Sequence, residues 1–184
     1  MQEILKKAEE KMKKSVAALN DEFKTIRTGR ASAALFDQVK VNYYGTPTPL
    51  NQVATVSIPE ARLVVIQPWD KGMLNEIEKA IQKSELSVNP SNDGKVIRIN
   101  IPPLTEERRK EFVKMAKNMA EQSRVAIRNI RREANDDLKK SSKAGDISED
   151  QEKQGTDESQ KLTDKYVKDI NGILQDKENE IMEI

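Results

Sequence analysis

Residues 105–140 carry a long helical pattern that no Pro or Gly interrupts. At about 100° per residue, the apolar and small side chains fall on a single stripe that a helix must bury: Phe112, Ala116, Met119, Ser123, Ala126, Ile127, Ile130, Ala134 and Leu138. Thr105 suits the N-cap, and Glu106 and Glu107 follow where the helix dipole favours carboxylates. At about 1.5 Å per residue such a helix is on the order of 50 Å long. It therefore needs packing partners along its whole length.

The opposite side of this helix gathers basic side chains into a band roughly 100° wide. We call it the basic band; its members are Lys110, Lys114, Lys117, Arg124, Arg128, Arg131 and Arg132. Exposed helices often carry Lys and Arg for solubility and helix propensity, so a solvated face is one interpretation. Contact with a polyanion is the other, because the planar fork of Arg suits bidentate binding of phosphate. The residues alone leave both interpretations open.

Two further segments have the apolar spacing of bundle helices. Residues 2–28 form the first, and Gly29 suits the left-handed position after a helix end. Ser148 opens the S-x-x-Q form of a capping box before the second, in which residues 149–161 are almost wholly polar and contain Gly155. We expect an antiparallel three-helix bundle, with thin packing over the first part of its last helix.

Between the first two helices the hydrophobic period changes to two, which is typical of strands. Strands are predicted at 39–43, 53–58, 63–66 and 95–101, and one helix at 71–85; GTPTPL and NPSNDG are predicted as turns. One helix covering a small sheet makes a β/α/β sandwich. The expected fold class is therefore α+β, a three-helix bundle with this small domain inserted.

Helix breakers mark both ends of the insertion. The expected domains are a bundle of residues 1–30 plus 105–184 and an inserted domain of residues 31–104. Only two stretches of chain cross this boundary, so relative motion of the domains is the default expectation. The predicted two-strand hinge consists of Gly29, Arg30, Ala31, Ser32, Pro102, Pro103, Leu104 and Thr105.

Composition excludes several kinds of site. The chain of 184 residues has neither His nor Cys, which removes imidazole bases, thiolates and the common zinc ligands. The Gly-containing stretches TGRAS and SNDGK lack the spacing of nucleotide-binding loops. Carboxylates stand among lysines at helical spacing, as on solvated surfaces, although a catalytic pair is the alternative. We expect no catalytic residue, metal site or cofactor.

Charge and hydropathy limit the partners and the cellular location that the sequence predicts. Lys and Arg number 32 against 31 Asp and Glu, so only local segregation such as the basic band offers a route to nucleic acid. The chain shows neither a membrane-length apolar run nor a signal-peptide core, which predicts a cytoplasmic protein without membrane contact. Tyr43, Tyr44 and Trp69 could stack on bases, although core or edge packing is the commoner role of such aromatics.

Six stretches resemble the bacterial ribosome recycling factor family in sequence, order and spacing, over essentially the full chain. They are IRTGRAS at 26–32, YYGTPTPL at 43–50, LNQVATVSIPEAR at 50–62, IPPLTEERRK at 101–110, VAIRNIRREAND at 125–136 and QKLTDKYV at 160–167. Gly155, Ser159 and Gly172 depart from the family pattern and put local packing of the last helix in question.

The resemblance implies a near-L-shaped protein that acts after termination. With elongation factor G and GTP, such a factor dissociates ribosomes into subunits and releases mRNA and tRNA. It implies that the bundle lies on large-subunit ribosomal RNA and that Arg128, Arg131 and Arg132 contact it, Arg131 most firmly. Arg124, Lys117 and Lys110 complete the predicted RNA-binding set, and the protein is expected to be a monomer. The alternative is an RNA-binding or adaptor module that does not split ribosomes.

Overall fold

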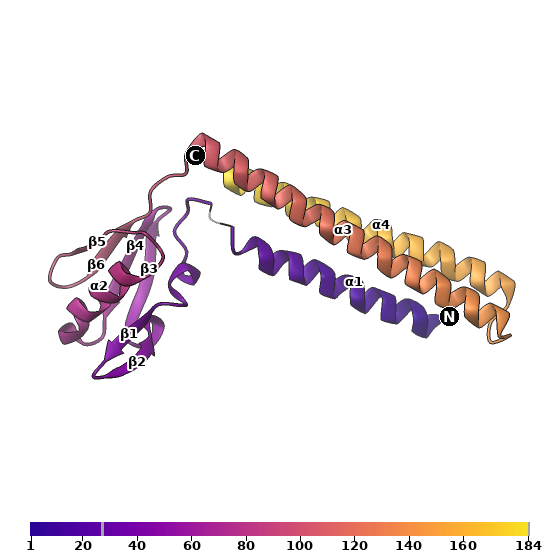
Figure 1. Cartoon of the computed structure of the whole chain (residues 1–184), viewed down its shortest axis with the longest axis horizontal. Helices are drawn as coiled ribbons and strands as arrows, with labels where there is room; N and C mark the ends of the chain where they lie inside the picture. Colours follow the sequence, from indigo (N-terminus) through magenta and orange to yellow (C-terminus); the bar gives the residue numbers. More distant parts are fainter. Residues whose placement is uncertain (27, 184) are drawn as a thin grey trace. The chain divides into compact units, whose positions relative to one another are not determined.

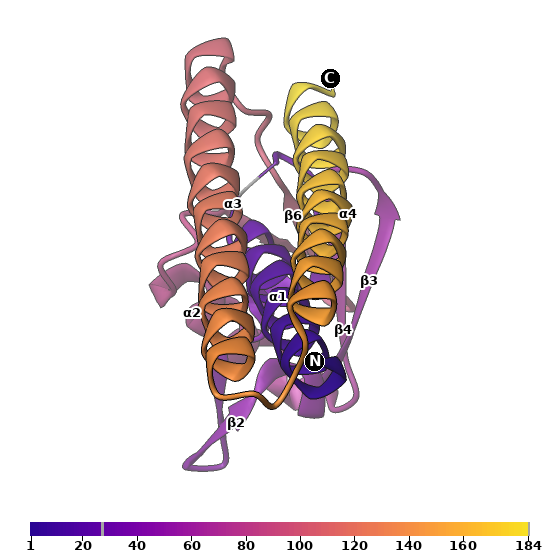
Figure 2. The same cartoon turned by 90° about the vertical axis from the view of Figure 1, so that its right-hand side faces the viewer.

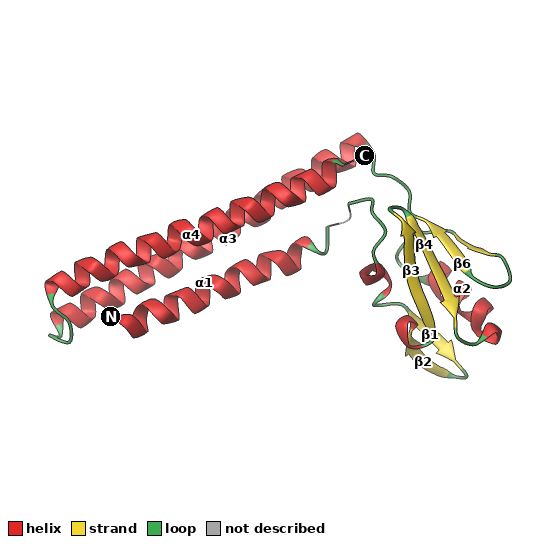
Figure 3. Cartoon of the chain, turned by 180° about the vertical axis from the view of Figure 1, so that it is seen from behind, coloured by secondary structure: helices red, strands yellow, loops and turns green. Residues whose placement is uncertain are grey.

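The computed structural model describes residues 1–26 and 28–183. The chain divides into two compact units (Figures 1 and 3). The helical unit joins Met1–Thr28 to Thr105–Ile184, and the sheet unit is Gly29–Leu104.

The helical unit consists of α1 (Gln2–Phe23), α3 (Glu106–Lys143) and α4 (Glu149–Met182). Residues 144–148 turn the chain back between α3 and α4, so these two helices are antiparallel, and Figure 2 shows all three side by side. The expected three-helix bundle is confirmed. It is part of an α+β fold, as the sequence predicts.

The long helix α3 begins as predicted, because the Thr105 side chain accepts a hydrogen bond from the amide of Arg108. Its buried stripe is also largely as predicted. The difference is that Ala120 is fully buried, whereas Met119, Ala126 and Ile130 are only partly buried. Because α3 packs against both α1 and α4, the centre of its buried arc is set by two partners.

The prediction that residues 2–28 are helical is wrong at its end. Helix α1 stops at Phe23, where the backbone tightens: the amide of Thr25 bonds to the carbonyl of Glu22, and that of Ile26 to the carbonyl of Phe23. The Thr25 hydroxyl donates to the same Glu22 carbonyl over 2.6 Å. A side chain that competes for a helical carbonyl weakens helix continuation.

The prediction of thin packing at the start of α4 is also wrong. Ser148 does form the predicted capping box with Gln151. Beyond it, however, Gly155, Ser159 and Thr163 are buried. A Cβ atom on Gly155 would lie 2.9 Å from both δ carbons of Leu138, so small residues let α4 approach α3 closely. The Ser159 hydroxyl, which is fully buried, bonds to Asn135 Oδ1 over 2.6 Å.

The sheet unit contains two antiparallel sheets and one α-helix. The strands β1 (Lys40–Tyr43) and β2 (Thr46–Pro49) form a hairpin. The strands β3 (Ala54–Glu60), β4 (Leu63–Pro68), β5 (Pro90–Asn92) and β6 (Ile97–Asn100) form a sheet in the order β3-β4-β6-β5. Helix α2 (Leu74–Lys83) and both sheets share one apolar core.

Two of these strands were predicted as turns. In β2, Pro47 and Pro49 pair with Asn42 and Lys40, and β5 begins at Pro90. Proline cannot donate to a strand ladder and is confined to edge positions, which both strands occupy. These prolines are the reason why the sequence pattern indicates turns instead of strands at β2 and β5.

Candidate nucleic-acid interface

The structure brings the four arginines of the basic band together over two turns of α3 and separates them from Lys110. Arg124, Arg128, Arg131 and Arg132 lie within nine residues, whose eight steps of 1.5 Å make on the order of 12 Å of helix. Lys110 lies about 20 Å further along the axis and pairs with Glu106 over 2.9 Å. The arginines form one compact cationic surface, to which Lys110 does not belong.

Arg124 is held tightly by the protein. Its Nε donates to Glu121 Oε2 over 2.9 Å, and its Nη1 donates to Asn171 Oδ1 of α4 over 2.8 Å. Only 18% of its side chain is exposed. Arg124 therefore links α3 to α4 rather than projecting from the band as the helical projection suggested.

Arg128 is more open. Its side chain is 42% exposed, and Nη1 donates to the other oxygen of Glu121 over 3.3 Å. Glu121 thus contacts two arginines. The hydrogen bonds from Arg124 and then Arg128 hold the pKa of the Glu121 carboxyl below its usual range, so this carboxylate is ionised at neutral pH.

Arg131 and Arg132 have amide partners instead of carboxylates. Arg131 Nη1 donates to Gln160 Oε1 of α4 over 2.8 Å, and Arg132 Nη1 reaches Asn129 Oδ1 at 3.5 Å. An amide oxygen orients a guanidinium group without cancelling its charge. These two arginines therefore keep their full positive charge for an outside anion.

Lys117 completes the predicted set, and its partner is a carboxylate on α4. Its ammonium lies 3.7 Å from Glu178 of α4, and the Lys117 side chain is largely exposed. Glu178 is only 21% exposed, but Lys117 itself is 61% exposed, so the lysine can still face an anion.

Four residues that orient the arginines were missing from the sequence prediction: Glu121, Asn129, Gln160 and Asn171. Glu121 had a usable signal, since it precedes Arg124 by three residues and Arg128 by seven, a spacing that shares one helix face. Gln160 and Asn171 had none, because the register between two antiparallel helices is set by packing in three dimensions.

The exposed aromatics of the sheet unit are not part of its core. Tyr44 is 74% and Trp69 is 66% exposed. The Tyr44 hydroxyl donates to Asp70 over 2.7 Å, and the Trp69 indole N–H donates to Thr55 over 2.8 Å. Tyr43 and Tyr44 stack edge to face, with ring centroids 4.8 Å apart. The core-packing part of the prediction is therefore wrong for these rings, whereas Tyr43 does lie on an edge strand, β1.

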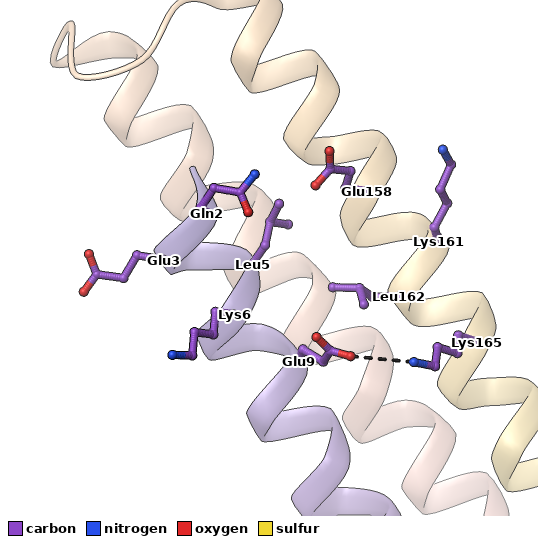
Figure 4. A pocket seen from close by; sticks show the side chains of 9 residues that line it. All are labelled: Gln2, Glu3, Leu5, Lys6, Glu9, Glu158, Lys161, Leu162 and Lys165. Carbon is purple, nitrogen blue, oxygen red and sulfur yellow. Dashed lines mark ion pairs between the residues drawn. The ribbon is translucent and has the colours of Figure 1, made fainter.

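The helical unit also has a groove between α1 and α4 (Figure 4). Lysines and glutamates alternate along its rim, among them Lys6, Glu9, Glu158 and Lys161. Glu9 accepts a hydrogen bond from the buried hydroxyl of Tyr166 over 2.7 Å and pairs with Lys165 at 3.7 Å. Mixed charge of this kind does not suit a polyanion, which needs a surface of one sign.

The hydrogen bond between Glu9 and Tyr166 changes both pKa values. The Tyr166 hydroxyl and the neighbouring lysines hold the pKa of Glu9 below its usual range. Burial, followed by the bond to Glu9, raises the pKa of Tyr166 to about 12. At neutral pH the pair is a neutral donor on a charged acceptor, which is a structural arrangement joining α1 to α4.

Backbone hydrogen bonds fix the chain at or beside both crossings of the predicted hinge. The amide of Ala31 bonds to the carbonyl of Ala61 over 2.7 Å, and the amide of Ile101 bonds to the carbonyl of Arg62 over 2.8 Å. Gly29 has φ +77°, and a Cβ there would lie 3.4 Å from Leu104. The entering and leaving segments thus meet beside the turn between β3 and β4.

Ser32 and Thr105 each cap a helix at the edge of this region. Ser32 accepts a hydrogen bond from the amide of Ala34 in a short 3-10 helix, and Thr105 caps α3. The peptide bonds at Pro102 and Pro103 are trans, since the described residues contain no cis peptide.

The described part of the chain offers neither a metal centre nor a membrane span. No group of three or more His, Cys, Asp or Glu side chains within residues 1–26 and 28–183 is placed to hold a metal ion. None of the helices described is long and apolar enough to cross a bilayer.

Comparison with known proteins agrees with this architecture. A family model described as ribosome recycling factor matches residues 19–182. The ribosome-recycling factor of Treponema denticola is 63% identical over 183 residues, which cover 100% of this chain and 99% of that protein. The one from Caldicellulosiruptor bescii is 59% identical over the full length of both.

Solved structures show the same relationship. The solution structure of a ribosome recycling factor matches with a TM-score of 0.75 at 45% identity, covering 100% of this chain and 97% of that one. The T. thermophilus ribosome recycling factor, in models with E. coli elongation factor G bound to the E. coli post-termination complex, matches with a TM-score of 0.63 at 48% identity over 98% of both chains. The chain belongs to the ribosome recycling factor family.

Proposed function

We propose that this protein, together with elongation factor G and GTP, dissociates post-termination ribosomes into subunits and so releases mRNA and tRNA. One observation carries the proposal: the chain matches, over nearly its whole length, a factor that has been placed with elongation factor G on a post-termination complex. Its site of action is the ribosome in the cytoplasm.

In this proposal the helical unit binds large-subunit ribosomal RNA through the arginines of α3. Arg131 and Arg132 supply the strongest attraction, because their partners are amide oxygens rather than carboxylates. Arg128 adds its exposed edge, and Lys117 adds a second point of charge. Arg124 acts mainly by joining α3 to α4, and Lys110 contributes from a distance.

The protein itself is proposed to be non-catalytic. GTP hydrolysis by the partner supplies the work, and the bundle transmits force to the contacts between the subunits. The long uninterrupted α3, which packs against both α1 and α4, suits a part that transmits force. The two crossings at Gly29–Ser32 and Pro102–Thr105 would let the sheet unit swing while the bundle stays bound. We propose that it acts as a monomer.

Gradient sedimentation of post-termination ribosomes tests the proposal. The protein with elongation factor G and GTP should convert intact ribosomes into subunits, whereas either factor alone should not. Intact ribosomes that persist in the complete mixture, although the protein is bound to them, would favour the alternative of a binding or adaptor module.

A further inference from the structure

Glu121 places a negative charge inside the proposed RNA-binding surface. Its Oε2 accepts from Arg124 over 2.9 Å, and its Oε1 accepts from Arg128 over 3.3 Å. Both carboxylate oxygens therefore occupy guanidinium donors that a phosphate group could otherwise use. The Glu121 side chain is itself about half exposed, so an incoming phosphate meets it directly.

This arrangement distributes the positive charge unevenly over the arginine surface. At one end, two arginines share one carboxylate, and Arg124 is further fixed by Asn171. At the other end, Arg131 and Arg132 contact only amide oxygens among their hydrogen-bond partners in the described structure. Phosphates are attracted to the second end and are repelled where they approach over Glu121.

We propose that Glu121 is a specificity-determining residue, which weakens binding to arbitrary RNA more than binding to the ribosome. The proposal rests on the RNA contact proposed above. An arbitrary RNA binds in many orientations, and most of these bring phosphates over the whole arginine cluster. A ribosomal surface of fixed shape needs only Arg131, Arg132 and the open edge of Arg128. A repulsive group beside the productive contacts therefore penalises wrong partners, as specific interfaces require.

The test compares Glu121→Gln with Glu111→Gln. Glu111 is a matched control because it also pairs with an arginine three residues away on α3, Arg108, at 2.6 Å, but outside the basic band. Each variant is titrated against two probes: a fluorescently labelled RNA duplex of unrelated sequence, and intact ribosomes. Circular dichroism verifies that both variants keep the helical content of the wild type.

For Glu121→Gln, we expect binding to the duplex to tighten on the order of fourfold, the effect of removing one charge near a phosphate in water. The dependence of duplex binding on salt should steepen by about one released ion. Ribosome binding should change by less than duplex binding, so the ratio of the two affinities falls. Glu111→Gln should leave that ratio unchanged.

Four outcomes would overturn the proposal. Equal tightening on both probes, or the same effect from Glu111→Gln, would show that only long-range charge matters. Weaker binding to both probes would show that Glu121 orients the arginines instead of opposing phosphate. Wild-type protein that fails to bind ribosomes in the same titration would overturn the proposed function itself, which separates the two failures.

Discussion

Arg131 donates a hydrogen bond from Nη1 to Oε1 of Gln160 over 2.8 Å, which joins α3 to α4 at the surface proposed to bind RNA. The bond fixes the direction of the guanidinium group and leaves its charge uncompensated by any carboxylate among its described partners. Orientation and charge at this position can therefore be changed separately by substitution.

Replacing Arg131 with alanine should lower ribosome affinity and leave the fold intact. Because the side chain is only partly buried, the free energy of unfolding should change by about 0.5 kcal/mol or less. Affinity should be measured at several salt concentrations, since the loss of one phosphate contact also flattens the salt dependence. Arg108→Ala, on the same helix outside the band, is the control. Equal affinity of wild type and Arg131→Ala at moderate salt would mean that the band is a solvated face.

Replacing Gln160 with alanine removes the oriented partner and keeps the charge of Arg131. We expect a smaller loss of ribosome affinity than in Arg131→Ala, with an unchanged salt dependence, because the number of cations is the same. Binding curves of the two variants, recorded side by side, make the comparison. If Gln160→Ala binds ribosomes as tightly as the wild type, the hydrogen bond is not what positions the guanidinium group.

Replacing Gly155 with alanine should destabilise the bundle by about 1–3 kcal/mol, because the new Cβ meets both δ carbons of the fully buried Leu138. Gly172 provides the matched control in the same helix, since a Cβ there has no neighbour within 4 Å. Gly172→Ala should stabilise by about 0.5–1 kcal/mol through helix propensity. Urea unfolding of both variants measures the two opposite signs, and a stabilised Gly155→Ala protein would contradict the close approach of α4 to α3.

Tyr166 should add a pH dependence to stability on the alkaline side. Its pKa in the folded protein is raised from the ordinary 10 to about 12. A raised pKa means that this contribution is fully present below pH 10 and is lost as pH rises from 10 towards 12. Tyr166→Phe should lack this part of the decline, and its phenol titration should lack the transition at about pH 12. Identical alkaline unfolding profiles for the two proteins would show that burial and the bond to Glu9 do not raise the pKa of Tyr166.

A disulfide that locks the helical unit to the sheet unit should leave ribosome binding measurable and stop subunit splitting. The chain contains no cysteine, so an engineered pair, with one residue in each unit, would be the only thiols. Oxidised and reduced forms should be compared by gradient sedimentation at matched ribosome occupancy. Equal splitting by both forms would remove interdomain motion from the proposed mechanism.

The sequence predicted those elements whose pattern and chemistry agree. Helix α3, the N-cap Thr105 and the capping box at Ser148 all follow from local rules, and the structure confirms them. The end of α1 was not predicted, because the Thr25 hydroxyl bonds to a carbonyl that a longer helix would use. Strand β2 was not predicted, because it contains prolines, which only an edge strand tolerates. At the candidate site, the arginines were visible on one helix, whereas Gln160 and Asn171 depend on how α4 lies against α3. The small residues of α4 led to a prediction of thin packing. In the structure they instead allow α4 to pack closely against α3.

The anchors beside the hinge consist of backbone atoms alone. The amides of Ala31 and Ile101 bond to the carbonyls of the consecutive residues Ala61 and Arg62. Any side chain can therefore occur at these four positions without breaking either bond, except proline at Ala31 or Ile101, which would remove the donor. The side chains at these four positions can therefore vary among homologous proteins, while the backbone hydrogen bonds that hold both crossing segments are kept.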